Sequence, residues 1–242
     1  MIEWLRRGIS AILRLPLRLV PRDAIVRILS GELRGWRWIA GSSTNGCWLG
    51  NYERHVQRLF RQRLHAGAVV LDIGANVGFF TLLASRMVGS AGHVYAFEPL
   101  PRNLRFLERH IQLNEVTNVS VEALAIAAAS GEARFQIAPH ASMGSLSDGG
   151  ELQVETASLD DLLGEHRIAT PQFIKMDIEG AEGEALRGAA KLLAHRPLTI
   201  VLSTHGFAQH ELCWKILQRT GFQLDLLRDG ITDGDYLILA TK

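Results

Sequence analysis

The sequence has little of what marks several large classes of protein. Two cysteines, Cys47 and Cys213, are too few for a disulfide framework and do not have the spacing of a metal-binding motif. No apolar run reaches the ~18 residues that a membrane-spanning helix needs. Arg14, Pro16 and Arg18 interrupt the apolar start of the chain, which is not typical of a signal peptide. We therefore expect a protein of the reducing cytoplasm.

The chain also has almost no net charge, at +1, which argues against nucleic acid as a partner. The charge is unevenly distributed, because residues 1–40 hold eight arginines, no lysine and three acids, a net of +5. The arginines of residues 1–30 alternate with apolar residues such as Trp4. Such a basic amphipathic segment can lie on an anionic membrane, or pack on the rest of the chain or on a second copy in a homodimer. Both alternatives are open.

The central feature is a glycine-containing turn between an apolar run and a helical pattern. Residues 69–73 are apolar and β-branched, which is typical of a strand buried in a parallel sheet. Residues 74–78 contain two glycines, and apolar side chains then recur at helical spacing from Phe80 to Met87. This order places a helix N-terminus at the carboxyl edge of a sheet, where nucleotide-like ligands bind.

The turn differs from the dinucleotide-binding sequence G-x-G-x-x-G, because Asn76 replaces the middle glycine. This difference argues against a nucleotide-dependent oxidoreductase. Asp72, just before the turn, suits a ligand with an ammonium group. Glu98 follows the next apolar run, at residues 94–97, and can accept hydrogen bonds from ribose hydroxyls. A ribose beside an amino-acid moiety describes S-adenosylmethionine.

Four segments carry a resemblance to a known family that covers residues 44–240. They are Gly50-Asn51-Tyr52-Glu53, residues 72–78, Phe97-Glu98-Pro99 and the run Lys175-Met176-Asp177-Ile178-Glu179-Gly180-Ala181-Glu182. With these segments the sequence resembles the class I S-adenosylmethionine-dependent methyltransferases, and within them the FkbM family. The resemblance implies a cofactor site formed by Glu53, Asp72, Gly74, Ala75, Asn76, Gly78, Glu98 and Asp177.

Alternating strand and helix patterns indicate an α/β fold with a doubly wound sheet. The resemblance implies a Rossmann-like, mostly parallel sheet of seven strands with an antiparallel edge strand. We expect this methyltransferase domain at residues 46–242, after an N-terminal helical arm and linker at residues 1–45. Within the domain, one helix should begin near Pro101 and bury Leu104, Leu107 and Ile111. Another should begin at Gly180 and bury residues up to Leu193.

Asp177 and His205 are the candidate catalytic residues, since each comes at the end of an apolar strand pattern. Methyl transfer to a hydroxyl needs a base or a metal, and histidine has an ordinary pKa of about 6.5. The family commonly has Glu-x-His where this chain has Ser203-Thr204-His205, so the orientation of His205 is left open. Asp177 and Glu179 can also contribute to a divalent cation site. Their spacing alone does not support a metal.

The resemblance implies O-methylation of a hydroxyl on a sugar, lipid or natural product. The partners we expect are therefore a small-molecule, glycan or lipid acceptor, with peripheral membrane contact through residues 1–30 as an open alternative. A protein that binds S-adenosylmethionine without transferring its methyl group is the alternative function.

Overall fold

The computed structural model describes residues 19–137, 144–146, 149–231 and 234–242. The chain divides into two compact units, the first ending at Arg54 and the second comprising His55–Lys242. Most of the predicted basic amphipathic segment, residues 1–18, lies outside the described residues. Within the described ranges, no helix is long and apolar enough to cross a membrane.

The first unit contains strands as well as a helix. Strand β1 (Ile25–Arg27) pairs antiparallel with β2 (Arg37–Ile39), and helix α2 (Asn45–Leu49) follows. Trp38 of β2 is completely buried. Where the sequence predicted a helical arm and a linker, residues 25–39 thus form a short strand pair with its own buried aromatic side chain.

The second unit is built on a sheet of seven strands. In spatial order these are β12 (Gln223–Asp229), β13 (Asp235–Thr241), β11 (Thr199–His205), β10 (Phe173–Met176), β3 (Val69–Ile73), β4 (His93–Phe97) and β5 (Val119–Glu122). The strands from β11 to β5 are parallel to one another, whereas β13 is antiparallel to both of its neighbours. The predicted mostly parallel sheet is confirmed. Its antiparallel strand, β13, lies one place in from the edge, which is formed by β12.

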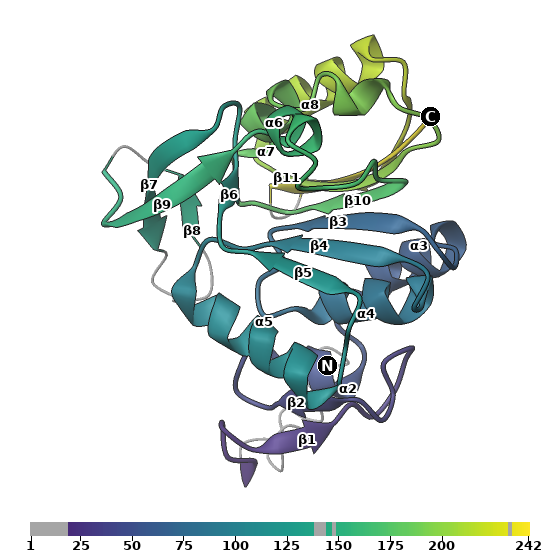
Figure 1. Ribbon diagram of the computed structural model, residues 1–242, viewed down its shortest axis with the longest axis vertical. Coiled ribbons are helices and arrows are strands. Elements are labelled where there is room, and N and C mark those ends of the chain that lie inside the picture. Colours follow the sequence, from purple (N-terminus) through teal and green to yellow (C-terminus); the bar gives the residue numbers. More distant parts are fainter. Residues whose placement is uncertain (1–18, 138–143, 147–148, 232–233) are drawn as a thin grey trace, which may run out of the picture. The chain divides into compact units, whose positions relative to one another are not determined.

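Helices cover both faces of this sheet, and for this reason its central strands are mostly apolar, apart from Asp72 in β3 and Lys175 in β10. Figure 1 shows α4 and α5 on one face and α6, α7 and α8 on the other. The helices of the second unit and at its start are α3 (Arg54–Arg63), α4 (Phe79–Val88), α5 (Pro101–Leu113), α6 (Leu159–Gly164), α7 (Glu182–Arg187) and α8 (Phe207–Arg219). Leu71, Ile174 and Ile200 are register partners on three adjacent strands and are all buried, which places the core against the middle of the sheet.

A smaller sheet of four strands accompanies the main one. Its strands are β6 (Ala125–Ile126), β9 (Leu152–Ala157), β7 (Gly131–Ile137) and β8 (Gly144–Leu146). It has a separate apolar cluster that includes Phe135 and Val154. In Figure 1 the smaller sheet lies on the side of the main sheet where the parallel strands, such as β10 and β4, end.

Two predicted helices differ from the structure. On α5, Leu107 is buried as expected, but Leu104 and Ile111 are only half-buried, and Asn103 and His110 are buried instead. This rotation of the buried face brings polar side chains toward the glycine-containing turn.

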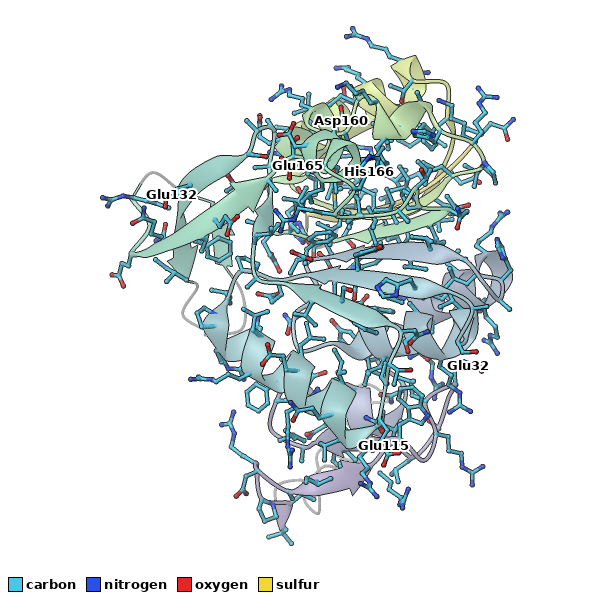
Figure 2. All side chains as sticks on the ribbon, viewed as in Figure 1. Glu32, Glu115, Glu132, Asp160, Glu165 and His166 are labelled. Carbon is cyan, nitrogen blue, oxygen red and sulfur yellow. The ribbon has the colours of Figure 1, made fainter. Side chains whose placement is uncertain are left out.

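The helix predicted from residue 180 is short. Helix α7 ends at Arg187, and a 3-10 turn, η2 (Leu192–Ala194), follows separately. Asp160 of α6 (Figure 2) accepts hydrogen bonds from the backbone N–H groups of Lys191 and Leu192, at 2.9 Å each, and so supports the start of this turn.

Substitution of Gly74 tests the close approach of the turn to the backbone of Asp177. The φ of Gly74 is +78°, and a Cβ at this position would overlap the carbonyl oxygen of Asp177. Gly67 has nearly the same φ, +82°, but nothing near a built Cβ. We expect Gly67→Ala to lower the free energy of unfolding by about 1–2 kcal/mol, the cost of a left-handed alanine. We expect Gly74→Ala to lower it by about 2–5 kcal/mol, because overpacking adds to that strain. Urea unfolding of both variants measures the difference, and equal costs would contradict a close approach of Asp177.

Candidate active site

The glycine loop, residues 72–78, lies at the carboxyl end of β3 and is tied to the end of β4. The backbone N–H groups of Gly74 and Ala75 both donate to the carbonyl of Phe97, at 3.0 Å. Asn76 has a φ of 50°, a left-handed conformation that asparagine tolerates better than most residues. Asn76 therefore serves in this turn where a dinucleotide loop has glycine.

Glu98 holds the glycine loop from the adjacent strand end. Its Oε2 accepts from the N–H of Asn76 at 2.8 Å, and its Oε1 accepts from Leu100 N at 2.9 Å and from Asn103 Nδ2 at 3.2 Å. Burial raises the pKa of Glu98, and these N–H donors oppose the shift. The residue predicted to bind ribose is thus also a structural anchor of the loop.

Helix α5 supports the loop through a buried histidine. His110 Nδ1 lies 2.8 Å from the carbonyl oxygen of Val77, so Nδ1 carries the proton and donates it. Burial lowers the pKa of His110 to about 4, against a smaller opposite effect of this hydrogen bond. The imidazole is therefore neutral at pH 7.

Asp72 is 1% exposed and has partners within the protein. Its Oδ2 accepts a hydrogen bond from Thr81 Oγ1 at 2.6 Å, and its Oδ1 lies 3.9 Å from Lys175 Nζ. Burial raises the pKa of Asp72, whereas Lys175 and Thr81 lower it. Through these contacts with Thr81 and Lys175, Asp72 stabilises the glycine loop.

Lys175 connects the glycine loop with the candidate catalytic edge. Its Nζ donates to the carbonyl of Gly74 at 3.3 Å and lies 3.6 Å from Asp177 Oδ2. The backbone N–H of Asp177 also donates to the carbonyl of Ile73 at 3.0 Å, which continues the pairing of β10 with β3. The position of Asp177 relative to the loop is therefore fixed by both backbone and side-chain contacts.

Asp177, Glu179 and His205 converge at the end of β10 and β11. His205 Nε2 lies 3.5 Å from Asp177 Oδ1 and 3.6 Å from Glu179 Oε2. The other ring nitrogen, Nδ1, donates to Oε1 of Glu182 at 2.8 Å, and Glu182 is completely buried. Glu182 supplies the acid that the Ser203-Thr204-His205 sequence lacks, and it orients the imidazole.

This environment changes the charge of His205. Burial alone lowers its pKa, but the Glu182 hydrogen bond and the carboxylates of Asp177, Glu182 and Glu179 together raise it to about 9. The sequence-based role of His205 as a base assumed an ordinary pKa, and this environment raises that pKa. The imidazole is charged at neutral pH, and its Nε2–H is directed at two carboxylates.

The structure brings most of the predicted site residues to one edge of the sheet. The residues placed there are Asp72, Gly74, Ala75, Asn76, Gly78, Glu98, Asp177 and His205, from the ends of β3, β4, β10 and β11. Glu53 belongs to the first unit, and its role in cofactor binding stays a prediction. Sequence reasoning missed Thr81 and Glu182 as supporting residues. Glu182 stands in the run that carries the family resemblance, which was the available signal.

The site thus combines a glycine-containing turn at the carboxyl edge, an acid at the end of the adjacent strand and a seven-stranded sheet with an inserted antiparallel strand. A family model described as "Methyltransferase FkbM domain" matches residues 72–224, more than half of the chain. The chain belongs to this family. The predictions of the family, of the fold and of S-adenosylmethionine as cofactor are confirmed.

A curated relative is similar to this chain at low sequence identity. A hexuronic acid methyltransferase, AglP, of Haloferax volcanii is 28% identical over 151 residues, which is 62% of this chain and 61% of the relative. The chain thus spans about three fifths of the length of this curated relative.

Solved structures with low identity agree in fold. The methyltransferase FkbM of Methylobacillus flagellatus is 17% identical, with a TM-score of 0.51, over 82% of this chain and 55% of that one. An S-adenosylmethionine-dependent O-methyltransferase of Thermotoga maritima is 14% identical, with a TM-score of 0.56, over 91% of this chain and 78% of that one.

Replacing Glu98 tests the cofactor site. We expect Glu98→Ala to weaken binding of S-adenosylhomocysteine by about 1–3 kcal/mol, because ribose hydroxyls and the N–H of Asn76 lose their acceptor. Glu108→Ala, which removes an exposed acid of α5, is the matched control and should bind like the parent protein. Calorimetry measures both affinities. Unchanged affinity in Glu98→Ala, or binding of NADH in place of S-adenosylhomocysteine, would exclude this site.

The charge of His205 predicts a pH dependence of stability. The pKa of His205 is about 9 in the folded protein and 6.5 as a reference, so its contribution is fully present below pH 6.5 and is lost as pH rises through 9. Asp177, Glu179 and Glu182 face the ring, and Asp235 on β13 is its register partner. We expect the stability advantage of the parent protein over His205→Gln to shrink between pH 6.5 and 10 in chelator-treated samples. NMR titration of the imidazole gives the pKa directly, and a value below 7 would contradict the expected rise in the pKa of His205.

Proposed function

We propose that this protein transfers the methyl group of S-adenosylmethionine to a hydroxyl of a sugar, with uronic acid glycosides as the acceptor class. The observation that carries the proposal is the Lys175 bridge, because it joins the glycine loop to Asp177 within one set of contacts. A donor held by the loop therefore has an acidic edge beside it, where an acceptor can approach.

The chemistry requires an in-line displacement. The acceptor oxygen attacks the methyl carbon, the carbon–sulfur bond breaks with its electron pair going to sulfur, and S-adenosylhomocysteine leaves. The hydroxyl proton must go to a base. Charged His205 cannot take it, so in the metal-free site this role falls to the carboxylates of Asp177 and Glu179. His205 then positions these carboxylates.

The sugar acceptor is supported by the relative from Haloferax volcanii, whose name states that it acts on a hexuronic acid. Asp177 and Glu179 offer acceptors for sugar hydroxyls. Cytoplasmic location, and membrane or dimer contact through residues 1–30, stay predictions from the sequence.

A methylation assay tests the reaction class. The full chain is incubated with S-adenosylmethionine and with methyl glycosides of glucuronate, galacturonate, glucose and galactose, and products are identified by mass spectrometry. We expect one added methyl group on the uronates, in a linkage that resists mild alkali, because an ether survives treatment that hydrolyses a methyl ester. Alkali-labile product would place the methyl on the carboxylate and contradict hydroxyl transfer.

Variants connect the activity to the edge residues. Asp177→Ala should lower turnover by about 10²–10⁴-fold. His93→Ala, at the amino end of β4, should leave turnover unchanged and is the control. Binding of S-adenosylhomocysteine without any product on the whole panel would favour the alternative of a binding protein without transfer.

A further inference from the structure

Three side chains at the candidate catalytic edge present ligand atoms to a common point. Asp177, Glu179 and His205 each offer one atom, and these atoms all lie within 4.8 Å of one another. Asp177 and Glu179 follow β10, while His205 ends the adjacent parallel strand β11. Glu179 has a left-handed φ of 55°, which is uncommon outside glycine and asparagine.

The distances between these atoms suit coordination better than direct hydrogen bonding. His205 Nε2 is 3.5 Å from Asp177 Oδ1 and 3.6 Å from Glu179 Oε2. An N–H···O hydrogen bond is usually about 2.7–3.2 Å long. Two ligands of one tetrahedral ion, each bound at about 2.1 Å, are about 3.4 Å apart. The two distances from His205 Nε2 therefore match the separation of ligands that share an ion.

Glu182 provides an independent indication. A histidine that binds a metal usually donates its other ring N–H to a carboxylate, which fixes the ring and leaves one nitrogen for the ion. Glu182 Oε1 accepts from His205 Nδ1 at 2.8 Å and from the N–H of Gly180 at 3.0 Å. The side chain is completely buried, and its Oε2 has no hydrogen-bond partner in the described part of the chain. Nε2 is thereby the nitrogen turned toward Asp177 and Glu179.

The groups around these atoms carry an excess of negative charge, which favours a bound cation. Asp177, Glu179 and Glu182 all contact His205, and Asp235 acts on Glu179 as a further negative charge. Lys175 pairs with Asp177 at 3.6 Å but is shared with Asp72 at 3.9 Å. A partly buried group of carboxylates is stabilised by an added positive charge.

We propose that Asp177, Glu179 and His205 bind one divalent transition-metal ion, and that Glu182 positions His205 for it. One imidazole and two carboxylates suit Mn²⁺ or Zn²⁺ better than Mg²⁺, which prefers oxygen ligands alone. Three protein ligands leave coordination positions for an acceptor hydroxyl.

The use of the ion rests on the methyl transfer proposed above. A hydroxyl coordinated by the ion has a lowered pKa and loses its proton to solvent as its oxygen attacks the methyl carbon. The carbon–sulfur electron pair goes to sulfur, so no further reactant is needed.

Metal titration of the full chain tests the site without any acceptor. Protein freed of metal by a chelator, and then of the chelator, is titrated with Mn²⁺, and free Mn²⁺ is measured by electron paramagnetic resonance. Zn²⁺ is added in competition. We expect one Mn²⁺ per chain, displaced by Zn²⁺. His205→Ala and Glu179→Gln should weaken binding at least ~10-fold, and Glu182→Gln about 10–100-fold.

Controls separate local from general effects. His93→Ala removes a histidine at the opposite edge of the sheet and should bind Mn²⁺ like the parent protein. Circular dichroism shows whether each variant is folded, and Glu179→Gln decides the outcome if Glu182→Gln unfolds. Equal affinity in the parent protein and in His205→Ala, or no binding of either ion by the parent protein, would overturn the proposal. Metal binding without methyl transfer to any acceptor would overturn the proposed function alone.

Discussion

The buried ammonium group of Lys175 is the interaction on which the candidate site depends. A charge in an apolar central strand is costly unless it is paired, and removing one partner leaves the other uncompensated. Lys175 is 5% exposed and contacts Asp72, Asp177 and the carbonyl of Gly74. These contacts come from β3, from the glycine loop and from the end of β10. The same group therefore holds together the part of the site that receives the donor and the part that faces an acceptor.

Backbone geometry sets where these groups meet. Parallel strands end at one edge of the sheet, so residues from β3, β4, β10 and β11 gather there although they are distant in sequence. The approach of Asp177 to the loop requires that residue 74 have no Cβ. Glu98 then fixes the loop through the N–H of Asn76. Main-chain contacts thus set where the strand ends lie, and the side chains of Lys175 and Glu98 fix the glycine loop between them.

Local sequence patterns predicted the strands and the turn that form this site. They did not predict the hydrogen-bond partners and charge states of its side chains. The apolar run at residues 69–73 matches β3, because a strand buried on both faces leaves a clear signature. The pattern of α5 did not indicate that His110 is buried, since this residue contacts Val77, 33 positions away, through a hydrogen bond. The substitution of Ser203 for an acid looked like a loss for His205. Glu182, at the start of α7, provides an acidic partner for His205 instead. The turn after β10 brings Glu182 Oε1 to 2.8 Å from His205 Nδ1. Neither the partner nor the raised pKa of His205 follows from spacing along the chain.

The arrangement around His205 can serve two charge states with little movement. In both states Glu182 accepts the Nδ1–H, so the ring orientation stays the same. The difference is confined to Nε2, where either a proton or a divalent ion neutralises Asp177 and Glu179. A proton at Nε2 leaves a hydroxyl acceptor with only carboxylates as bases, whereas an ion lowers the pKa of the hydroxyl itself. The carboxylates that keep His205 protonated are therefore the same groups that favour an ion in its place. The reactivity of the edge then depends on which cation they hold.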